Sequence, residues 1–419
     1  MQQATAGLAL PAHILLLAPT GSGKTLAFAI PLLRSLGQPS QGVQALVIAP
    51  TRELALQVYE VIRPLAAPEY KTVALYGGHS FITEQNSLRS GADIIVATPG
   101  RLLDHLHRGS TVVQQVSTLV FDEYDKSLEL GFLDDIKAIC KRLRNVHTVI
   151  MTSATRLQQL PDFIDLSSLQ TVDFTQESDV PVPDIDFRRV DSPEADKLDT
   201  LENLLRDTAG GRSLVFVNHR VAAERVYKRL KEEGFPVGLY HGGLDQDLRR
   251  RALTLFVNGT TPVLVSTDLA SRGLDIGGLE AVIHYHLPVS AEVMTHRNGR
   301  TGRMGAPGKA FAIISPSDKI PDFFPALDEY YPEGSAAIES PRWKTLYFNV
   351  GKKEKISRGD IVGYLINKGG LPKDDIGRID VDDHCAYVAV AAEKAAEALL
   401  RLAGQKIKNV RAKVSLLKT

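Results

Sequence analysis

Along most of this chain, short hydrophobic runs alternate with longer segments of helical periodicity. Most runs are apolar at every position, a pattern typical of parallel strands that are covered by helices on both faces. In the first part of the chain the expected strands are Ile14–Leu17, Ala45–Ala49, Val73–Tyr76, Asp93–Ala97, Thr118–Phe121 and Thr148–Met151. This alternation predicts an α/β domain built on a parallel sheet.

A second series of hydrophobic runs follows a break at Asp173–Pro183. The break contains two prolines and the polar stretch Gln176–Asp179, and we interpret it as an interdomain linker. Beyond it the expected strands are Ser213–Val217, Val237–Tyr240, Val263–Ser266, Ala281–Tyr285 and Ala310–Ile314. They predict a second parallel sheet of similar size. No sequence repeat is visible, so any likeness between the two halves is expected to be structural only.

The chain changes character after a second break, Pro321–Pro341. Strands are then expected at Thr345–Gly351, Ala386–Val390 and Val410–Leu416, and helices at Arg358–Leu365 and Glu393–Leu402. This βαββαβ-like order predicts a small α+β domain of the RRM type. We therefore expect three domains, at residues 1–174, 184–320 and 343–419.

Composition narrows the possible functions. A chain of 419 residues is too long for one core, and its formal net charge of zero means that any basic surface must be local. The stretch from Arg401 onward has such local charge, with six basic residues and no acidic one. Cys140 and Cys385 lack metal-ligand spacing, which argues against zinc and disulfides and fits a reducing compartment. Without a visible membrane span or signal peptide, we expect a cytoplasmic protein.

The stretch Ala18–Thr25 has the form of a phosphate-binding loop. It follows a hydrophobic run and precedes the helix-like segment Leu26–Ile30. A strand, a glycine loop, a Lys-Thr pair and a helix form the context in which this pattern binds nucleotides. Backbone N–H groups and the helix N-terminus would cradle the phosphates. Lys24 would reach the outer phosphates and Thr25 would ligate Mg²⁺.

Complementary charges lie farther along the chain. Asp122 and Glu123 follow an apolar strand, where one carboxylate could hold Mg²⁺ through water and the other could activate an attacking water. The segment His296–Arg303 carries three arginines and a histidine. Such a cluster could complete a phosphate site from a second domain as an arginine finger does, or could form a basic loop facing nucleic acid.

A whole series of motifs resembles the DEAD-box family of ATP-dependent RNA helicases, which are built from two RecA-like domains. In family order the matching segments are Ala18–Thr25, Pro50–Leu54, Gly77–Gly78, Thr98–Arg101, Asp122–Asp125, Ser153–Thr155, Val215–Asn218, Gln246 with Arg249, Ser266–Asp268, Arg272–Asp275 and His296–Arg303. Any one of these motifs is weak evidence, but the ordered set is specific.

The resemblance implies a role for each matching residue. The ATP-binding set is Gln2, Thr20, Gly21, Ser22, Gly23, Lys24, Thr25 and Asp275, with Mg²⁺ at Thr25 and Asp122. The catalytic set is Lys24, Asp122, Glu123, Arg300 and Arg303, and Ser153 and Thr155 would couple the ATP state to strand separation. Residues implied to grip the RNA backbone are Arg52, Gly78, Thr98, Arg101, Thr267 and Arg272. Such backbone contacts bind RNA regardless of its sequence.

Two residues and the short N-terminus depart from the family pattern. Tyr124 replaces the alanine of the motif that names the family, and Asn298 replaces an apolar residue in the last motif. Only a short segment precedes the phosphate loop, and Gln2 stands at the interval usual for the glutamine that reads adenine. Because both catalytic carboxylates are kept, we expect the protein to be active.

The C-terminal segment resembles the RNA-binding domain of bacterial DEAD-box proteins that act on large-subunit ribosomal RNA. The likeness lies in Leu346–Tyr347, Gly351–Lys353, Gly359–Gly363 and Asp375–Ile379. His384–Tyr387 lacks the paired aromatic residues of a standard base-stacking strand. We therefore expect RNA binding through the basic residues Lys352, Lys353, Arg411 and Lys413.

The expected activity is that of an RNA-dependent ATPase that locally unwinds structured RNA, with ribosomal RNA as the substrate and ATP and Mg²⁺ as cofactors. Closure of the two RecA-like domains would be coupled to ATP hydrolysis. We keep two alternatives: an ATP-gated RNA clamp, and a DNA helicase of the same superfamily. Measuring strand displacement together with ATP turnover distinguishes the clamp from a helicase. Comparing ATPase stimulation by RNA and by DNA distinguishes an RNA helicase from a DNA helicase.

Overall fold

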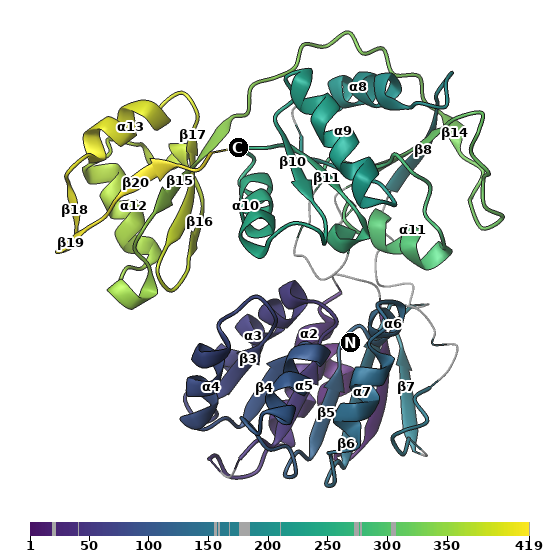
Figure 1. The fold of residues 1–419 in the computed structure, drawn as a ribbon, viewed down its shortest axis with the longest axis vertical. Helices are drawn as coiled ribbons and strands as arrows, with labels where there is room; N and C mark the ends of the chain where they lie inside the picture. Colours follow the sequence, from purple (N-terminus) through teal and green to yellow (C-terminus); the bar gives the residue numbers. More distant parts are fainter. Residues whose placement is uncertain are drawn as a thin grey trace. The chain divides into compact units, whose positions relative to one another are not determined.

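The computed structural model describes residues 1–418 except 19–21, 41, 155–156, 158–159, 167, 176–184, 210, 272–275, 277–278 and 303–306 (Figure 1). The chain forms two compact units, each described here by itself. The first is Met1–Val182, and the second consists of Pro183–Ser271 and Ile276–Thr419. Among the described residues, no helix has the length and apolar character needed to cross a membrane.

The first unit is a parallel sheet of seven strands in the order β3-β4-β2-β5-β6-β1-β7. The strands are β1 (His13–Leu17), β2 (Ala45–Ile48), β3 (Thr72–Leu75), β4 (Ile94–Ala97), β5 (Thr118–Phe121), β6 (Thr148–Ser153) and β7 (Leu169–Asp173). All six strands expected from the hydrophobic pattern are present. The edge strand β7 was not predicted, because its residues are polar and partly exposed.

Helices cover both faces of this sheet (Figure 1). They are α1 (Gln2–Ala6), α2 (Lys24–Arg34), α3 (Arg52–Ala66), α4 (Phe81–Arg89), α5 (Pro99–His107), α6 (Tyr124–Glu129) and α7 (Leu133–Cys140). Alternate residues of one strand enter different cores: Leu46 and Ile48 lie in one cluster, and Ala45 and Val47 in the other. The uninterrupted apolar runs in the sequence are therefore explained by burial on both faces.

The second unit begins with a second parallel sheet, in the order β10-β11-β9-β12-β13-β8-β14. Its elements are β8 (Ile185–Asp191), α8 (Leu198–Asp207), β9 (Ser213–Phe216), α9 (Arg220–Glu232), β10 (Val237–Tyr240), α10 (Gln246–Val257), β11 (Val263–Ser266), η1 (Asp268–Ser271), β12 (Ala281–His284), α11 (Ala291–Asn298), β13 (Gly308–Ile314) and β14 (Asp328–Glu329). When the strands of each sheet are counted along the sequence, the two sheets have the same strand order. The two halves thus share one topology, as expected. The short strand β14 lies in what the sequence presents as a break.

The same unit ends in a small domain with a four-stranded antiparallel sheet, in the order β16-β17-β15-β20. Its elements are β15 (Trp343–Phe348), η2 (Lys352–Glu354), α12 (Arg358–Asn367), η3 (Lys373–Asp375), β16 (Ile376–Val381), β17 (Ala386–Ala391), α13 (Ala395–Leu402), β18 (Lys406–Ile407), β19 (Val410–Arg411) and β20 (Val414–Leu416). The α+β prediction is confirmed. The single last strand expected at Val410–Leu416 is instead divided between β19, which pairs with β18, and β20.

Candidate functional site

The predicted motifs of the first unit follow the carboxyl ends of its parallel strands, the edge at which such sheets bind ligands. Arg52, Gly78 and Thr98 follow β2, β3 and β4, which are neighbours in the sheet. Asp122 follows β5, Ser153 ends β6, and the phosphate loop follows β1; these three strands are also neighbours. The topology therefore separates the proposed RNA residues from the ATP residues along one edge.

The phosphate loop is described from Ser22 onward, so Thr20 and Gly21 lie outside the described residues. Gly23 has φ +85°, a left-handed conformation that favours glycine, and it precedes the first residue of α2. The buried Lys24 Nζ donates to the carbonyl of Ala18 at 2.8 Å, which holds the ammonium over the loop. The geometry suits a phosphate ligand that replaces this carbonyl as acceptor.

Gln2 reaches the same loop from α1. Its Nε2 donates to the carbonyl of Gly23 at 3.5 Å, and a Cβ at position 23 would come within 2.5 Å of that Nε2. A glutamine near the start of the chain is thus placed beside the phosphate loop. The adenine-reading role that the resemblance implies for Gln2 stays a prediction.

The carboxylates of Asp122 and Glu123 are buried against the end of β6. Thr152 Oγ1 donates to Asp122 Oδ1 at 2.6 Å and accepts the backbone N–H of Glu123 at 2.9 Å. Burial, followed by the neighbouring carboxylate of Glu123, raises the pKa of Asp122 to about 6. Among the described residues, Glu123 Oε2 is buried without a hydrogen-bond partner. A divalent cation and an ordered water would satisfy both groups, so the residues fit a Mg²⁺-dependent hydrolase site.

The backbone at Glu123 is also unusual. Its φ is +49°, a left-handed conformation that is rare for a residue other than glycine, and it stands at the N-cap of α6. Asp125 Oδ2 accepts the N–H of Ala154 at 3.3 Å, which links the acidic motif to the motif after β6. Thr155 lies outside the described residues. Sequence reasoning missed Thr152, although it directly precedes Ser153.

Tyr124 is 1% exposed and packs into the core beneath the site. Its ring lies 5.4 Å from the ring of Phe121. Burial raises the pKa of the phenol to about 12, so the side chain is neutral. The large residue at this family position therefore serves as a core residue.

Three of the predicted RNA-binding residues shape tight backbone turns. A Cβ at Gly77 would come within 2.9 Å of the Arg52 guanidinium, so glycine permits the close approach of this side chain. Gly78 has φ +83°, which again favours glycine. Thr98 is the N-cap of α5, with Pro99 at the first helical position.

Arg101 is held by Glu84, a residue that sequence reasoning missed. Arg101 Nε donates to Glu84 Oε2 at 2.6 Å, and its Nη2 donates to the carbonyl of His79 at 2.7 Å. Glu84 also contacts His105 at 2.9 Å and accepts the N–H of Tyr76 at 3.1 Å. Burial alone would raise the pKa of Glu84, but the hydrogen bonds from His105 and Arg101 outweigh it and lower the pKa. The carboxylate thus ties the turn after β3 to α5.

In the second unit, Arg297 organises the carboxyl ends of the strands. Its side chain is fully buried and donates to Asp268 Oδ1 at 2.6 Å, to Asn218 Oδ1 at 2.8 Å and to the carbonyl of His286 at 2.8 Å. These partners follow β9, β11 and β12, so one guanidinium joins the loops after three strands, and two of these loops carry predicted motifs. Thr267 lies beside Asp268, directly after β11.

The structure explains why a polar residue, Asn298, stands where the family has an apolar one. Its Oδ1 lies 2.8 Å from Nε2 of His284, which is fully buried. Burial lowers the pKa of His284 to about 3, so the imidazole is neutral and Nε2–H donates to the amide oxygen. A polar residue at this position is needed because it satisfies the buried histidine.

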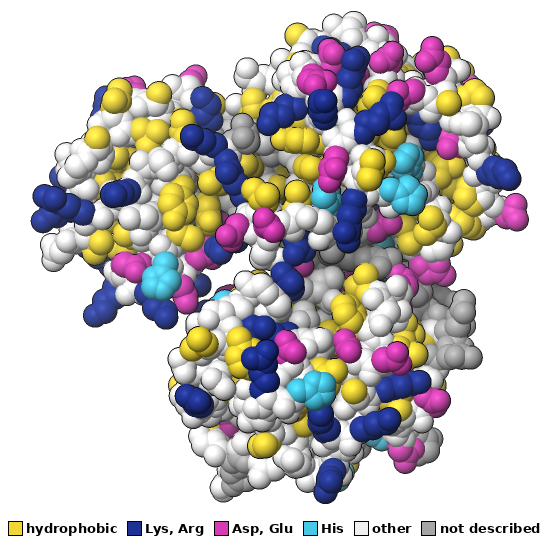
Figure 2. All heavy atoms as spheres, viewed as in Figure 1, with side chains coloured by type: hydrophobic (Ala, Val, Ile, Leu, Met, Phe, Trp, Pro, Cys, Tyr) yellow, Lys and Arg dark blue, Asp and Glu magenta, His cyan; other side chains and the backbone are white. Residues whose placement is uncertain are grey.

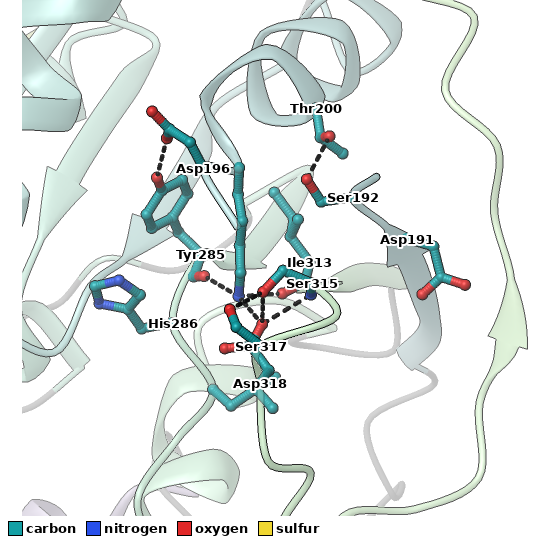
Figure 3. Close-up of polar contacts among 12 residues, drawn as sticks. Asp191, Ser192, Asp196, Thr200, Tyr285, His286, Ile313, Ser315, Ser317 and Asp318 are labelled. Carbon is teal, nitrogen blue, oxygen red and sulfur yellow. Dashed lines mark hydrogen bonds and ion pairs between the residues drawn. The ribbon is translucent and has the colours of Figure 1, made fainter. Parts of the chain in front are cut away.

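Lys197 is a further residue that sequence reasoning missed, and Figure 3 labels its partners Tyr285, Ile313 and Asp318. Its buried Nζ donates to the carbonyls of Tyr285 at 3.0 Å and Ile313 at 2.7 Å, and lies 2.5 Å from Asp318 Oδ2. Asp318 in turn accepts the N–H of Ser315 at 2.8 Å. The cluster holds the ends of β12 and β13 together, next to the segment that accepts Arg297.

The remaining predicted catalytic, ATP-binding and RNA-binding residues of the second helicase domain are only partly described. Arg300 follows α11 and is 2% exposed. Arg272, Asp275 and Arg303 lie outside the described residues.

The predicted basic residues of the C-terminal domain are exposed: Lys352, Lys353, Arg411 and Lys413. Lys and Arg side chains lie along the outer margin of this domain, near β18 and β19 (Figure 2). A hollow of about 450 Å³ is lined by Lys352 together with Lys355 and Arg358, which sequence reasoning missed. The rings of Tyr347 and Tyr387 pair across β15 and β17 at 5.6 Å, and the Arg250 guanidinium lies 5.6 Å from the Tyr387 ring.

The sequence matches three protein-family models. The DEAD/DEAH box helicase model covers residues 1–163, the helicase conserved C-terminal domain covers residues 196–305, and the DbpA RNA binding domain covers residues 345–416. Each model falls on one of the three sheets described above.

Known proteins are similar to this chain over most of its length. The ATP-dependent RNA helicase DbpA of Escherichia coli (strain K12) is 36% identical over 421 residues, which span 96% of this chain and 90% of that protein. DbpA of Bacillus subtilis (strain 168) is 32% identical over 434 residues, which span 94% and 89%. The structure of S. cerevisiae Dbp5 bound to RNA and ADP BeF3 has a TM-score of 0.67 at 29% identity and covers 76% of this chain and 83% of that one. This chain therefore belongs to the DbpA group of DEAD-box ATP-dependent RNA helicases.

Proposed function

We propose that this RNA helicase opens structured ribosomal RNA locally during ribosome assembly, with its C-terminal domain as the targeting element. The observation that carries the proposal is the segregation along the first sheet, where residues after β1, β5 and β6 suit ATP and residues after β2, β3 and β4 suit an RNA backbone. A ligand at one set would bias the other, because each ligand would favour the same closed arrangement of the two helicase domains.

The ATP site is proposed to use Lys24 for the outer phosphates and Gln2 for the adenine. Thr25 and Asp122 would hold Mg²⁺, which neutralises phosphate charge when it is bound. Glu123, whose Oε2 has no hydrogen-bond partner among the described residues, would orient and deprotonate the attacking water. Thr152 would keep Asp122 in position through its 2.6 Å hydrogen bond.

Turnover is proposed to require the second helicase domain. Arg300 and Arg303 would stabilise the charge of the transferred phosphoryl group, and Asp275 would contact the ribose. Since ATP and RNA would each favour the closed arrangement, each should promote binding of the other. Ser153 and Thr155 would transmit the ATP state to the RNA residues Arg52, Gly78, Thr98, Arg101, Thr267 and Arg272.

We propose that the C-terminal domain binds ribosomal RNA through Lys352, Lys353, Arg411 and Lys413. The hollow that Lys352 shares with Lys355 and Arg358 supports this, because three cations around one concave surface suit a phosphate backbone. The proposed domains remain residues 1–174, 184–320 and 343–419. The two free thiols, Cys140 and Cys385, fit a cytoplasmic location.

ATPase assays with and without RNA test the site. Lys24→Ala and Glu123→Gln should each lower RNA-stimulated turnover at least about a hundredfold, the contribution expected of a phosphate ligand or a general base. Glu129→Gln is the matched control, because Glu129 is an exposed carboxylate at the other end of α6, the helix that Glu123 caps. Full RNA-stimulated activity in either site variant would disprove the assignment.

A further inference from the structure

Thr152 is a fully buried residue near the end of β6, one position before Ser153. In the first sheet, β6 lies between β5 and β1, the two strands that lead into the acidic motif and the phosphate loop. Phe121 of β5 pairs with Met151 of β6 in parallel register. The residues that follow them, Asp122 and Thr152, therefore come side by side. The topology thus places a threonine on the middle strand of the predicted ATP site.

The hydroxyl group of Thr152 contacts both predicted catalytic carboxylate residues. It donates to Asp122 Oδ1 at 2.6 Å and accepts the backbone N–H of Glu123 at 2.9 Å. A threonine hydroxyl has a single hydrogen to donate, and here that hydrogen goes to a carboxylate. The distance of 2.6 Å falls in the range of about 2.5–2.7 Å that is typical of a hydroxyl donating to a carboxylate, a strong class of hydrogen bond. The hydroxyl therefore does more than satisfy itself in the core.

The hydrogen bond to Glu123 acts on a strained part of the backbone. Glu123 has φ +49°, a left-handed conformation that costs free energy for a residue other than glycine. Such a conformation persists only where neighbouring groups hold it. Thr152 Oγ1 accepts the N–H of this residue at the N-cap of α6. The side chain of Glu123 therefore takes its direction from a backbone that Thr152 helps to fix.

The end of β6 is also joined to the phosphate loop. The carbonyl of Ser153 accepts the N–H of Ala18 at 3.1 Å, and the carbonyl of Ala18 accepts a hydrogen bond from Lys24 Nζ at 2.8 Å. Two consecutive residues of one strand, Thr152 and Ser153, thus bond the acidic motif on one side and the phosphate loop on the other. Because β6 is held between β5 and β1, it gives both parts of the predicted site a common support.

We propose that Thr152 is a positioning residue for ATP hydrolysis, which fixes the carboxylate of Asp122 and the backbone of Glu123 in the orientation that hydrolysis requires. It acts through these two residues and not on the substrate itself. A displacement of a catalytic group by about 1 Å can lower a rate about a hundredfold, so such support affects turnover. The inference rests on the proposed function, because it takes Asp122 as a Mg²⁺ ligand and Glu123 as the base.

Two substitutions separate the hydroxyl group of Thr152 from its methyl group. Thr152→Val removes the hydroxyl and keeps the branched shape, whereas Thr152→Ser keeps the hydroxyl and removes the methyl. Thr152→Val should lower the kcat of RNA-stimulated ATP hydrolysis at least about tenfold, the size expected when a hydrogen bond to a charged group is lost. It should also raise the Mg²⁺ concentration that gives half-maximal activity. Thr152→Ser should keep most of the activity.

A measurement without metal or nucleotide tests the positioning directly. In the metal-free protein, amide hydrogen exchange at Glu123 should be at least about tenfold faster in Thr152→Val than in the wild type, because the acceptor of this N–H is lost. Thr152→Ser should exchange like the wild type. Binding of ATP in the absence of divalent metal should not change, because the hydrogen bonds of Lys24 and Gln2 go to the phosphate loop.

The matched control is Thr148→Val. Thr148 is a buried threonine four residues earlier in the same strand and on the same face, and its substitution should leave kcat and exchange at Glu123 unchanged. Chemical denaturation verifies that all variants fold. Wild-type kcat in Thr152→Val, or an unchanged exchange rate at Glu123, would overturn the proposal. An equal loss of kcat in Thr152→Ser would also overturn it, because the residue would then act through packing.

Failure of the proposed function gives a different result. If Lys24→Ala and Glu123→Gln keep full RNA-stimulated activity, the assigned ATP site is wrong, and the role of Thr152 is overturned with it. If both of these variants are inactive while Thr152→Val hydrolyses ATP like the wild type, only the role of Thr152 is overturned.

Discussion

At the scale of single residues, the departures from the family pattern have structural explanations. Tyr124 fills the core beneath the catalytic carboxylates, and Asn298 satisfies the buried imidazole of His284. Neither residue belongs to the predicted ATP-binding set. Because packing and hydrogen bonding explain both residues, neither departure argues against an active helicase.

The packing of Tyr124 leads to a prediction about stability. Tyr124→Ala should destabilise the first domain by about 3 kcal/mol, because it leaves a cavity next to Phe121. RNA-stimulated ATPase at low temperature should persist, since Asp122 and Glu123 are unchanged. Chemical denaturation and ATPase assays measure the two effects. Loss of activity in a variant that remains folded would show that Tyr124 acts on the site directly.

His284 makes stability depend on pH. Its pKa is about 3 in the folded protein, against about 6.5 in an unfolded chain, so between these values the unfolded chain binds the extra proton. Stability should therefore fall as the pH drops below about 6.5, by up to about 1.4 kcal/mol per pH unit from this group. Denaturation of wild type and His284→Gln between neutral and mildly acidic pH checks this. The variant should show a shallower decline; equal slopes would contradict the explanation.

At the scale of secondary structure elements, single buried side chains hold the ends of neighbouring elements. Glu84 joins α4 to α5 and to the turn after β3, and Lys197 joins the ends of β12 and β13. Arg297 does the same for the loops after β9, β11 and β12. The loops that carry the motifs are thus fixed by residues outside the predicted ATP-binding and RNA-binding sets.

Glu84→Gln tests this positioning role. The change removes the charged acceptor of Arg101 and His105, so we expect a loss of about 2 kcal/mol in stability. RNA should bind more weakly, because the turn at Gly77 and Gly78 is no longer anchored, while ATP binding should be unchanged. Fluorescence titrations with each ligand measure this split. Glu60→Gln is the control, since Glu60 is an exposed residue of α3. Equal weakening of both ligands would point to general unfolding instead.

At the scale of the whole molecule, two sheets of one topology are followed by a domain of a different class. The C-terminal domain docks on the second helicase domain through polar groups: Thr345, Asn258 and Thr260. Water can hydrate such groups when the docking partner is absent. The second helicase domain is therefore expected to remain folded without the C-terminal domain.

Deleting residues 343–419 should remove the preference for ribosomal RNA. ATPase stimulation by unstructured RNA should remain, because the predicted RNA residues of the two helicase domains are intact. The measurement compares stimulation by ribosomal and unstructured RNA in the full chain and in the shortened chain. An unchanged preference would contradict the targeting role.

The order of hydrophobic and polar residues determined the central strands of the two parallel sheets, and consecutive motifs supplied the predicted catalytic residues. These features depend on local patterns: apolar runs buried on both faces, and loops such as Ser22–Thr25 whose chemistry lies in consecutive residues. The tertiary structure decided which residues support them. Thr152 meets Asp122 across 30 positions of the chain, and Glu84 meets His105 across 21. Such pairings depend on how strands are ordered in a sheet and domains are joined, which no local pattern encodes.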